Sequence, residues 1–416
     1  MDRTRVLGVL ALGTLLLLAG CQAPGTPERP EFSPTVTVVN ATGAEQGTTI
    51  AVANNETLDP GLVFAQVRSL LDADVPPPTN VRVLDDLDAM AGGTPLGGES
   101  PVRRHLNVTM RGDLDLGDQE NGAVNQLGGI TIYPGEARDP MATTWVLAHE
   151  LTHYVQVRAG HAGTVRERVD LGTTDGQFTY RAMLEGPAVF STEAYLDEYA
   201  PGDETTLSLY RRIDDGLPDG SYGKYANRQY LLGYEYTRSL VDSPAELAGL
   251  YDRSARTSEQ VIHGYRPAEA PMAALTVTYE GGDGWAETGR DRMGEAFLWA
   301  ALEDRLGTDR ARTAAAGWGN DSLLMVYPTT EGNASFAWVH RWDDEANAST
   351  FAAAGETYLD RAGTAAGPVT RLDAGATARL ERLDERTTLL LVGERAFVTG
   401  TTGEAVGSRV RLVTTG

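Results

Sequence analysis

The sequence predicts an α+β protein, in which helices and strands are mixed along the chain. Two observations support this fold class. Apolar residues recur at helical spacing in some segments, such as 61–73, and alternate with other residues in segments such as 130–133. The 416 residues contain no repeat of fixed period, so the sequence does not predict a repeat architecture.

The first 21 residues have the pattern of a secretory signal. Arg3 and Arg5 precede an apolar run of residues 6–19, which is too short to span a bilayer comfortably. Cys21 ends the stretch Leu-Ala-Gly-Cys, where a lipobox places its modified residue, and it is the one cysteine of the chain. We therefore expect a lipoprotein, anchored by lipidated Cys21 to the outer face of the cytoplasmic membrane at the cell surface. An ordinary signal with an incidental cysteine is the alternative.

The stretch after the signal, residues 22–57, is expected to be a tether and N-terminal extension, because its first part is rich in proline and polar residues. The globular sequence begins near residue 58 and forms a first predicted domain, 58–270. Its predicted elements, in chain order, are a helix at 61–73, strands at 81–87 and 127–136, and helices at 140–159, 176–200 and 225–242.

The remaining sequence, 271–416, is predicted to be a second domain of α+β type. Along it, segments with continuous apolar runs are mixed with segments in which apolar residues recur at helical spacing. Its predicted elements are helices at 291–307 and 346–363, and strands at 323–328, 336–342, 387–393 and 395–400.

The chain is strongly acidic, with a net charge of −23, and its positive charge comes from 34 arginines and a single lysine, Lys224. Such a protein should avoid nucleic acids and anionic lipid surfaces. An acidic excess with almost no lysine indicates adaptation to high salt, where screening reduces repulsion between the charges. A GC-rich genome would explain the arginines but not the acidic excess.

Asparagine glycosylation is a further expectation for a surface protein. Of 11 asparagines, six stand in the acceptor pattern Asn-x-Ser/Thr. These are Asn40, Asn55, Asn107, Asn320, Asn333 and Asn347.

The strongest chemical signal is the sequence His-Glu-Leu-Thr-His at residues 149–153. Residues four apart in a helix point the same way, so His149 and His153 can hold one zinc ion through their ring nitrogens. Glu150 would lie beside the ion, where it can take the proton of a zinc-bound water. The neighbouring residues 146–148 and 151–155 carry no charge apart from His153, as a buried helix requires. Two exposed histidines on a surface helix are the alternative.

A catalytic zinc ion needs a third protein ligand and one open position. Glu185 is the better candidate because it lies on the next long predicted helix, 32 residues after His153. Glu193, on the same helix, is the alternative. His161 is disfavoured because it follows Gly160, which ends the histidine-bearing helix.

With Glu185 in this place, the sequence resembles the gluzincins, zinc metallopeptidases with a thermolysin-like core. Glu185-Gly186-x-Ala188 is similar to the E-G-x-A motif of compact members, and segments 228–240 and 257–267 are similar to secreted gluzincin-like lipoproteins of haloarchaea. The resemblance covers about residues 125–400. It implies a zincin-like core, with a small sheet and active-site helices, followed by a C-terminal α/β portion, and one zinc ion per chain.

The resemblance also implies an oxyanion donor from the downstream half, for which Tyr230 and His263 are the matching positions. Two positions depart from the family pattern. Val189 stands where thermolysin-like enzymes have an aspartate that orients a histidine ligand, and Gly264 stands where the family has proline after the histidine.

The expected function is therefore that of a cell-surface zinc metalloendopeptidase acting on peptide or protein substrates, with Glu150 as the base. Two alternatives stay open: a catalytically weak or inactive metal-containing binding or assembly lipoprotein, and a zinc hydrolase of a non-peptide amide or ester. An intact Glu150 favours an enzyme, because a purely structural metal site has no use for a base.

Overall fold

The computed structural model describes residues 36–39, 50–53, 58–83, 100–111, 120–124, 129–134, 140–202 and 205–415. The described part of the chain is 50% helical and 23% strand, which confirms the predicted mixture of helix and sheet. The signal sequence with Cys21, most of the tether and residues 84–87 lie outside the described residues.

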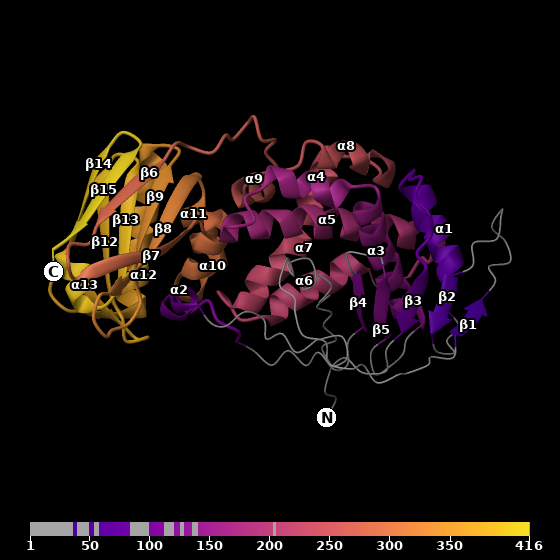
Figure 1. The fold of residues 1–416 in the computed structure, drawn as a ribbon, viewed down its shortest axis with the longest axis horizontal. Helices are drawn as coiled ribbons and strands as arrows, with labels where there is room; N and C mark the ends of the chain where they lie inside the picture. Colours follow the sequence, from indigo (N-terminus) through magenta and orange to yellow (C-terminus); the bar gives the residue numbers. More distant parts are fainter. Residues whose placement is uncertain are drawn as a thin grey trace, which may run out of the picture.

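A five-stranded mixed sheet lies at one end of the molecule, in indigo and purple in Figure 1. Its spatial order is β1-β2-β3-β5-β4, in which β2, β3 and β5 run parallel and both edge strands pair antiparallel with their neighbours. The strands are β1 (Val36–Val39), β2 (Ile50–Ala53), β3 (Asn80–Val83), β4 (Glu120–Val124) and β5 (Ile130–Pro134).

Helices α1 (Pro60–Leu70) and α3 (Pro140–Arg158) share an apolar core with this sheet. Phe64, Leu147 and Ile130 are among its buried members. The side chains of α1 that enter the core recur at helical spacing, so burial of one apolar face stabilises the helix against the strands. The sheet thereby fixes the position of α3, which carries the two histidines.

The centre of the molecule is helical. The two longest helices there, α5 (Thr174–Tyr199) and α7 (Tyr222–Leu240), pack against each other with backbones in contact, since a Cβ added to Gly186 would overlap the backbone of Gly233. The shorter helices around them are α4 (His161–Arg168), α6 (Thr206–Gly216), the 3₁₀ helix η2 (Pro244–Glu246), α8 (Leu247–Tyr251) and α9 (Ser258–His263).

The C-terminal part has two sheets. The larger is antiparallel with the spatial order β10-β11-β12-β13-β9-β8-β7, and the smaller has the order β14-β15-β6. The strands are β6 (Thr276–Glu280), β7 (Trp285–Asp291), β8 (Trp318–Pro328), β9 (Ser335–Trp342), β10 (Gly363–Ala365), β11 (Thr370–Leu372), β12 (Thr377–Asp384), β13 (Thr387–Gly393), β14 (Thr401–Val406) and β15 (Arg409–Thr414). The helices are α10 (Gly294–Leu306), α11 (Thr308–Ala315), α12 (Glu345–Ala362) and α13 (Arg395–Gly400).

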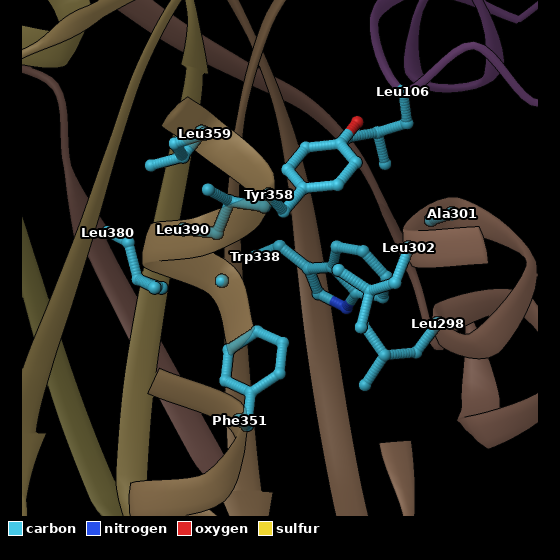
Figure 2. Close-up of a pocket in the computed structure, with 11 residues that line it drawn as sticks. Leu106, Leu298, Ala301, Leu302, Trp338, Phe351, Tyr358, Leu359, Leu380 and Leu390 are labelled. Atoms are coloured by element: carbon cyan, nitrogen blue, oxygen red, sulfur yellow. The ribbon is translucent and has the colours of Figure 1, made fainter. Parts of the chain in front are cut away.

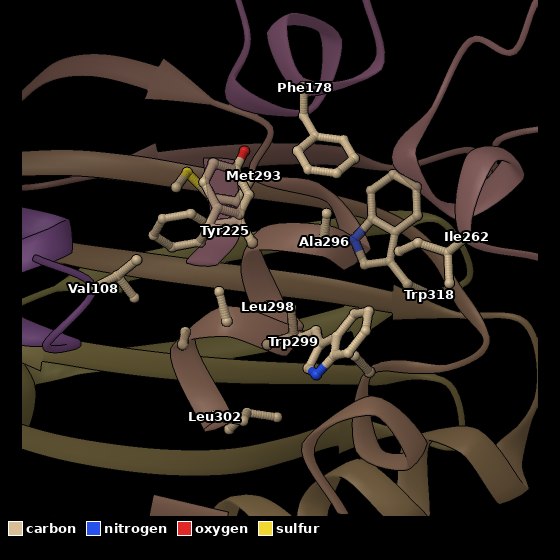
Figure 3. Close-up of a cluster of buried hydrophobic side chains, with 14 of the residues drawn as sticks. Val108, Phe178, Tyr225, Ile262, Met293, Ala296, Leu298, Trp299, Leu302 and Trp318 are labelled. Carbon is tan, nitrogen blue, oxygen red and sulfur yellow. The ribbon is translucent and has the colours of Figure 1, made fainter. Parts of the chain in front are cut away.

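The expected boundary near residue 270 falls in a largely exposed segment without helix or strand, between α9 and β6. One apolar core nevertheless continues across it. Figure 3 shows Phe178 of α5 and Tyr225 of α7 in the same cluster as Trp299 of α10 and Trp318 of β8. The two predicted domains are therefore joined by a shared core.

A short segment from the first half of the sequence also belongs to the C-terminal part. Helix α2 (Pro101–His105) and the residues after it pack near α10, where Asn107 and Arg111 contact Asp304. Leu106 lines a small cavity of about 20 Å³ with side chains of α10, α12 and the large sheet (Figure 2). Its apolar lining offers little to hold a water molecule, so the cavity is a packing defect.

One predicted strand is wrong. Residues 395–400 form helix α13, and Phe397 and Val398 are fully buried in it. Two adjacent apolar residues carry no period, so they suit a buried turn of helix as well as a strand. Among the described helices, none combines the length and apolar character that crossing a bilayer requires.

Candidate metal centre

The two histidines of α3 and the glutamate of α5 converge on one point inside the helical region. His149 and His153 lie one turn apart on α3, and Glu185 faces them from the middle of α5. One ligand atom from each side chain lies within 4.8 Å of the other two. Among the described residues, these three form the one group of histidine, cysteine and acidic side chains this close together, and we call it the His–His–Glu cluster.

The distances within this cluster fit a single small cation. The Nε2 atoms of His149 and His153 lie 3.2 and 3.0 Å from Glu185 Oε2, and 3.1 Å from each other. A tetrahedral ion with bonds of about 2.1 Å places its ligand atoms about 3.4 Å apart. Nitrogen and carboxylate oxygen are ligands that zinc accepts in proteins. The donor set therefore fits zinc in both chemistry and spacing.

Glu150 lies beside the cluster with its carboxyl group buried and unpaired. The side chain is 1% exposed, and neither carboxyl oxygen has a hydrogen-bond partner among the described residues. Burial raises the pKa of Glu150 to about 8; the charge of Glu185 adds to this and that of His153 opposes it. A nearby divalent cation would lower that pKa and favour the carboxylate.

Even without an ion, the His–His–Glu cluster holds opposite charges that stabilise each other. Burial disfavours the charge of His153, but attraction to Glu185 outweighs it and raises the pKa of His153 to about 9. Burial likewise opposes the charge of Glu185, while the charges of the histidines hold its pKa far below the usual range. A metal ion bound here must replace the proton on His153, so metal affinity should increase with pH.

One tyrosine ring lies near that of His149, and a second tyrosine stacks on the first. The Tyr230 ring lies 6.4 Å from that of His149, centroid to centroid, and stacks on Tyr210 of α6 at 4.4 Å. Burial raises the pKa of Tyr210 well above its usual value, and the charges of Tyr230, Glu185 and Glu150 add to this effect. Tyr230 was singled out from the sequence, whereas Tyr210 was not, although the apolar spacing of α6 could have revealed that helix.

His263 is engaged elsewhere. Its Nε2 lies 2.8 Å from Glu295 Oε1, and its ring stacks on Tyr265. Its described contacts include no member of the His–His–Glu cluster. The helix that carries His263 begins beside Asp175, whose carboxylate accepts from Ser258 N. Asp175 lies ten residues before Glu185 on α5, which corresponds to about 15 Å along the helix.

The alternative ligands also have other partners. Glu193 Oε1 accepts hydrogen bonds from the Thr206 hydroxyl and the Leu207 backbone amide, and so caps the start of α6. His161 stacks on Tyr251 at 4.7 Å. Neither side chain joins the His–His–Glu cluster.

The asparagines in the predicted glycosylation sites differ in their exposure to solvent. Asn320 is buried and its Nδ2 donates to the Ala273 carbonyl, so that nitrogen is not free to carry a glycan in the folded chain. Asn333 is exposed. Asn40 and Asn55 lie outside the described residues.

Comparison with known proteins gives a match only in the C-terminal part of the chain. Residues 280–402 match a family described as a domain of unknown function (DUF8575). No curated protein and no solved structure matches the chain. The matched segment begins after α9, so it leaves out the His–His–Glu cluster and Glu150.

Proposed function

We propose that this protein is a zinc-dependent metallopeptidase of gluzincin type, with a zincin-like core. One observation carries the proposal: three ligand atoms lie 3.0–3.2 Å apart beside a buried carboxyl group whose two oxygens have no described partner. A buried unpaired carboxyl group is costly, and such groups cluster at sites where they act on a ligand.

His149, His153 and Glu185 hold the ion in this proposal. A zinc ion with three protein ligands and one open position lowers the pKa of a water molecule and polarises a carbonyl group. Glu150 accepts the proton that the attacking water loses, and returns it to the amine nitrogen as the carbon–nitrogen bond breaks. Tyr230 supplies a hydroxyl donor for the oxyanion. His263 has no part in this site, because its described contacts are with Glu295 and Tyr265.

The sheet supports a peptide as the substrate. Strand β4 is the last in the order of its sheet, and it packs on α3, the helix with the histidines. An extended peptide can pair with such an edge through its backbone, whatever its sequence. A hydrolase of a non-peptide amide or ester has no need of a strand edge next to the histidine-bearing helix, so it is the second candidate.

The metal-containing binding or assembly protein is a weaker candidate. Structural zinc sites in proteins are closed by four protein ligands. The described residues supply three, and the acidic side chain next to them on α3 is unpaired. That arrangement suits a site that leaves one position for water or substrate.

The first test removes the base without removing the ligands. Purified Glu150→Gln protein in high salt should bind about one zinc ion per chain, as the wild type does. Its cleavage of unstructured peptides should be slower by about 10²–10⁴-fold, because the proton acceptor is lost. Cleavage at the wild-type rate would show that the mechanism is wrong.

The second test separates Glu185 from Glu193, the alternative ligand on the same helix. Glu185→Gln should weaken zinc binding by more than about 100-fold, since even the outer partners of metal ligands contribute about 10–100-fold. Glu193→Gln is the matched control and should keep the wild-type affinity, because Glu193 caps α6. Equal affinity of both variants in a chelator competition would contradict the assignment.

We also propose a membrane-anchored location through lipidated Cys21, from the position of this cysteine at the end of the signal pattern. Cys21→Ser should shift the protein from the membrane fraction to the soluble fraction. If both forms sediment with membranes equally, the anchor lies elsewhere.

A further inference from the structure

Gln156 makes three hydrogen bonds around the His–His–Glu cluster. It lies three residues after His153 on α3 and is 2% exposed. Its Oε1 lies 2.7 Å from His153 Nδ1. Its Nε2 donates to the Leu184 carbonyl at 2.9 Å and to the Tyr251 hydroxyl at 2.9 Å. Every polar atom of this side chain therefore has a partner, and one of those partners is a zinc ligand of the proposed site.

The chemistry of these partners fixes the orientation of the amide. A backbone carbonyl can only accept a hydrogen bond, so the group facing Leu184 O must be the NH₂ of Gln156. The amide oxygen then faces His153. Because an amide oxygen can only accept, His153 must carry a hydrogen on Nδ1 and donate it.

The same reasoning applies to the other ring nitrogen. A neutral imidazole with its hydrogen on Nδ1 has a bare lone pair on Nε2. That Nε2 lies 3.0 Å from Glu185 Oε2 and 3.1 Å from His149 Nε2. Lone pairs this close repel each other unless a proton or a metal ion lies between them. A neutral ring held by Gln156 is thus in the state that a metal ligand requires.

We propose that Gln156 is a positioning residue that holds His153 as the Nδ1–H tautomer, with Nε2 directed at the metal. This inference rests on the proposed metal site. The contact with Leu184 adds a second effect, because the Leu184 carbonyl belongs to the peptide bond that leads into Glu185. The Gln156 amide therefore fixes the orientation of the His153 ring and also its distance from Glu185.

A neutral amide also suits the charge of this site better than a carboxylate. Glu150 and Glu185 already place two acidic groups in a buried region. A third negative charge would add desolvation cost and repulsion. Glutamine accepts from Nδ1–H without a charge, and its NH₂ group satisfies two further acceptors.

The first experiment needs no substitution. In zinc-loaded wild-type protein with ¹⁵N-labelled histidine, NMR should show His153 protonated at Nδ1 and unprotonated at Nε2, and the Nδ1–H should exchange slowly with water. A hydrogen on Nε2 of His153, or metal on Nδ1, would overturn the proposal.

The second experiment measures zinc affinity by competition with a chelator, independently of activity. Gln156→Leu keeps the approximate size of the side chain but offers no acceptor, so its affinity should fall by about 10–100-fold. Gln156→Glu restores an acceptor for Nδ1–H but removes the NH₂ donor and adds a negative charge, so it should recover only part of this loss. Tyr251→Phe removes one of the two acceptors that hold the amide NH₂ and should have a smaller effect than Gln156→Leu.

The outcomes separate this inference from the proposed function. If the wild type binds zinc and Gln156→Leu binds it equally well with the same NMR signals, the role of Gln156 is refuted and the metal site stands. If the wild type binds no zinc, both fail. If Gln156→Leu does not fold, the NMR signals of His153 in the zinc-loaded wild type decide, because they report the position of its hydrogen directly.

Discussion

His340 is the most deeply buried described histidine outside the His–His–Glu cluster. It is 0% exposed on β9, and its ring centroid lies 4.5 Å from that of Trp338, 4.8 Å from that of Phe351 and 5.9 Å from that of Trp342. Its Nε2 has no hydrogen-bond partner in the described part of the chain. Because burial removes the water that would solvate an imidazolium, it lowers the pKa of His340 to about 3.

This pKa predicts a loss of stability in acid. The ordinary pKa of a histidine side chain is 6.5, so between pH 6.5 and about 3 the unfolded chain binds a proton that the native chain does not. As the pH decreases through this window, the free energy of unfolding should therefore fall by up to about 1.4 kcal/mol per pH unit because of His340 alone. His340→Gln should flatten this dependence in urea unfolding measured across the same pH range.

Thr388→Val is the control for this prediction, because it removes the neighbour of His340 Nδ1 without changing a titratable group. It should shift the unfolding free energy by a similar amount at every pH. A His340→Gln variant whose pH profile runs parallel to that of the wild type would show that His340 does not titrate as described.

At the same scale, part of the candidate metal centre could be predicted from the sequence. The placement of His149 and His153 on one face follows from helical geometry alone. Glu185 was favoured by its place on the next long predicted helix and by a motif resemblance. Gln156 and Tyr210 could not be assigned, because their roles depend on tertiary contacts. The partners of the Gln156 amide lie 28 and 95 residues away in the chain, and no local pattern encodes such distances.

Helices α5 and α7 provide the clearest prediction at the scale of an element. At their crossing a Cβ on Gly233 would overlap the Ala182 carbonyl, and a Cβ on Gly186 would overlap Gly233. Gly233→Ala should therefore destabilise the protein by about 1–3 kcal/mol or more, because two backbones must separate. Zinc affinity should fall too, since Glu185 precedes Gly186 on α5. Chemical unfolding and chelator competition measure the two effects.

Gly163→Ala is the matched control. Gly163 lies exposed on α4, where an added Cβ meets open space. This change should be neutral or stabilise the helix by up to about 1 kcal/mol. If Gly233→Ala is as stable as Gly163→Ala, the backbones are not in contact.

The predictability of the elements depended on burial. The helices at 140–159, 225–242, 291–307 and 346–363 overlap α3, α7, α10 and α12, because each has a regular apolar stripe or a long uncharged run. Strand β7 was not predicted, since most of its side chains are exposed and its sequence lacks alternation. Segment 395–400 was assigned to the wrong type because its apolar content is concentrated in two adjacent residues.

For the whole molecule, the shared core predicts that the N-terminal part does not fold alone. Helix α10 covers α5 and α7: the Tyr225 ring lies 5.8 Å from that of Phe297, and the buried Arg228 pairs with Glu303 at 2.5 Å. A fragment of residues 58–270 would expose this apolar surface and leave Arg228 without its acidic partner. It should be aggregated or largely unfolded by circular dichroism and size-exclusion chromatography, whereas residues 58–416 should unfold cooperatively.

A monomeric 58–270 fragment with native helix content and a single unfolding transition would contradict this expectation. The predicted boundary near residue 270 falls where the chain is largely exposed and forms neither helix nor strand. The sequence did not indicate that the cores on either side are continuous. Which apolar faces meet is decided by tertiary packing, and helical periodicity shows only that a face exists.

The unpaired carboxyl group of Glu150 runs against what selection for stability alone would favour. A leucine or methionine at this position would fill similar space without a desolvated acid, and the metal-free fold should gain stability from it. Random mutagenesis screened only for heat resistance should therefore recover apolar residues at position 150. A screen that also requires catalytic activity should not recover them. The difference in heat resistance between the variants from the two screens would measure how much stability the protein loses by keeping the Glu150 carboxyl group for catalysis.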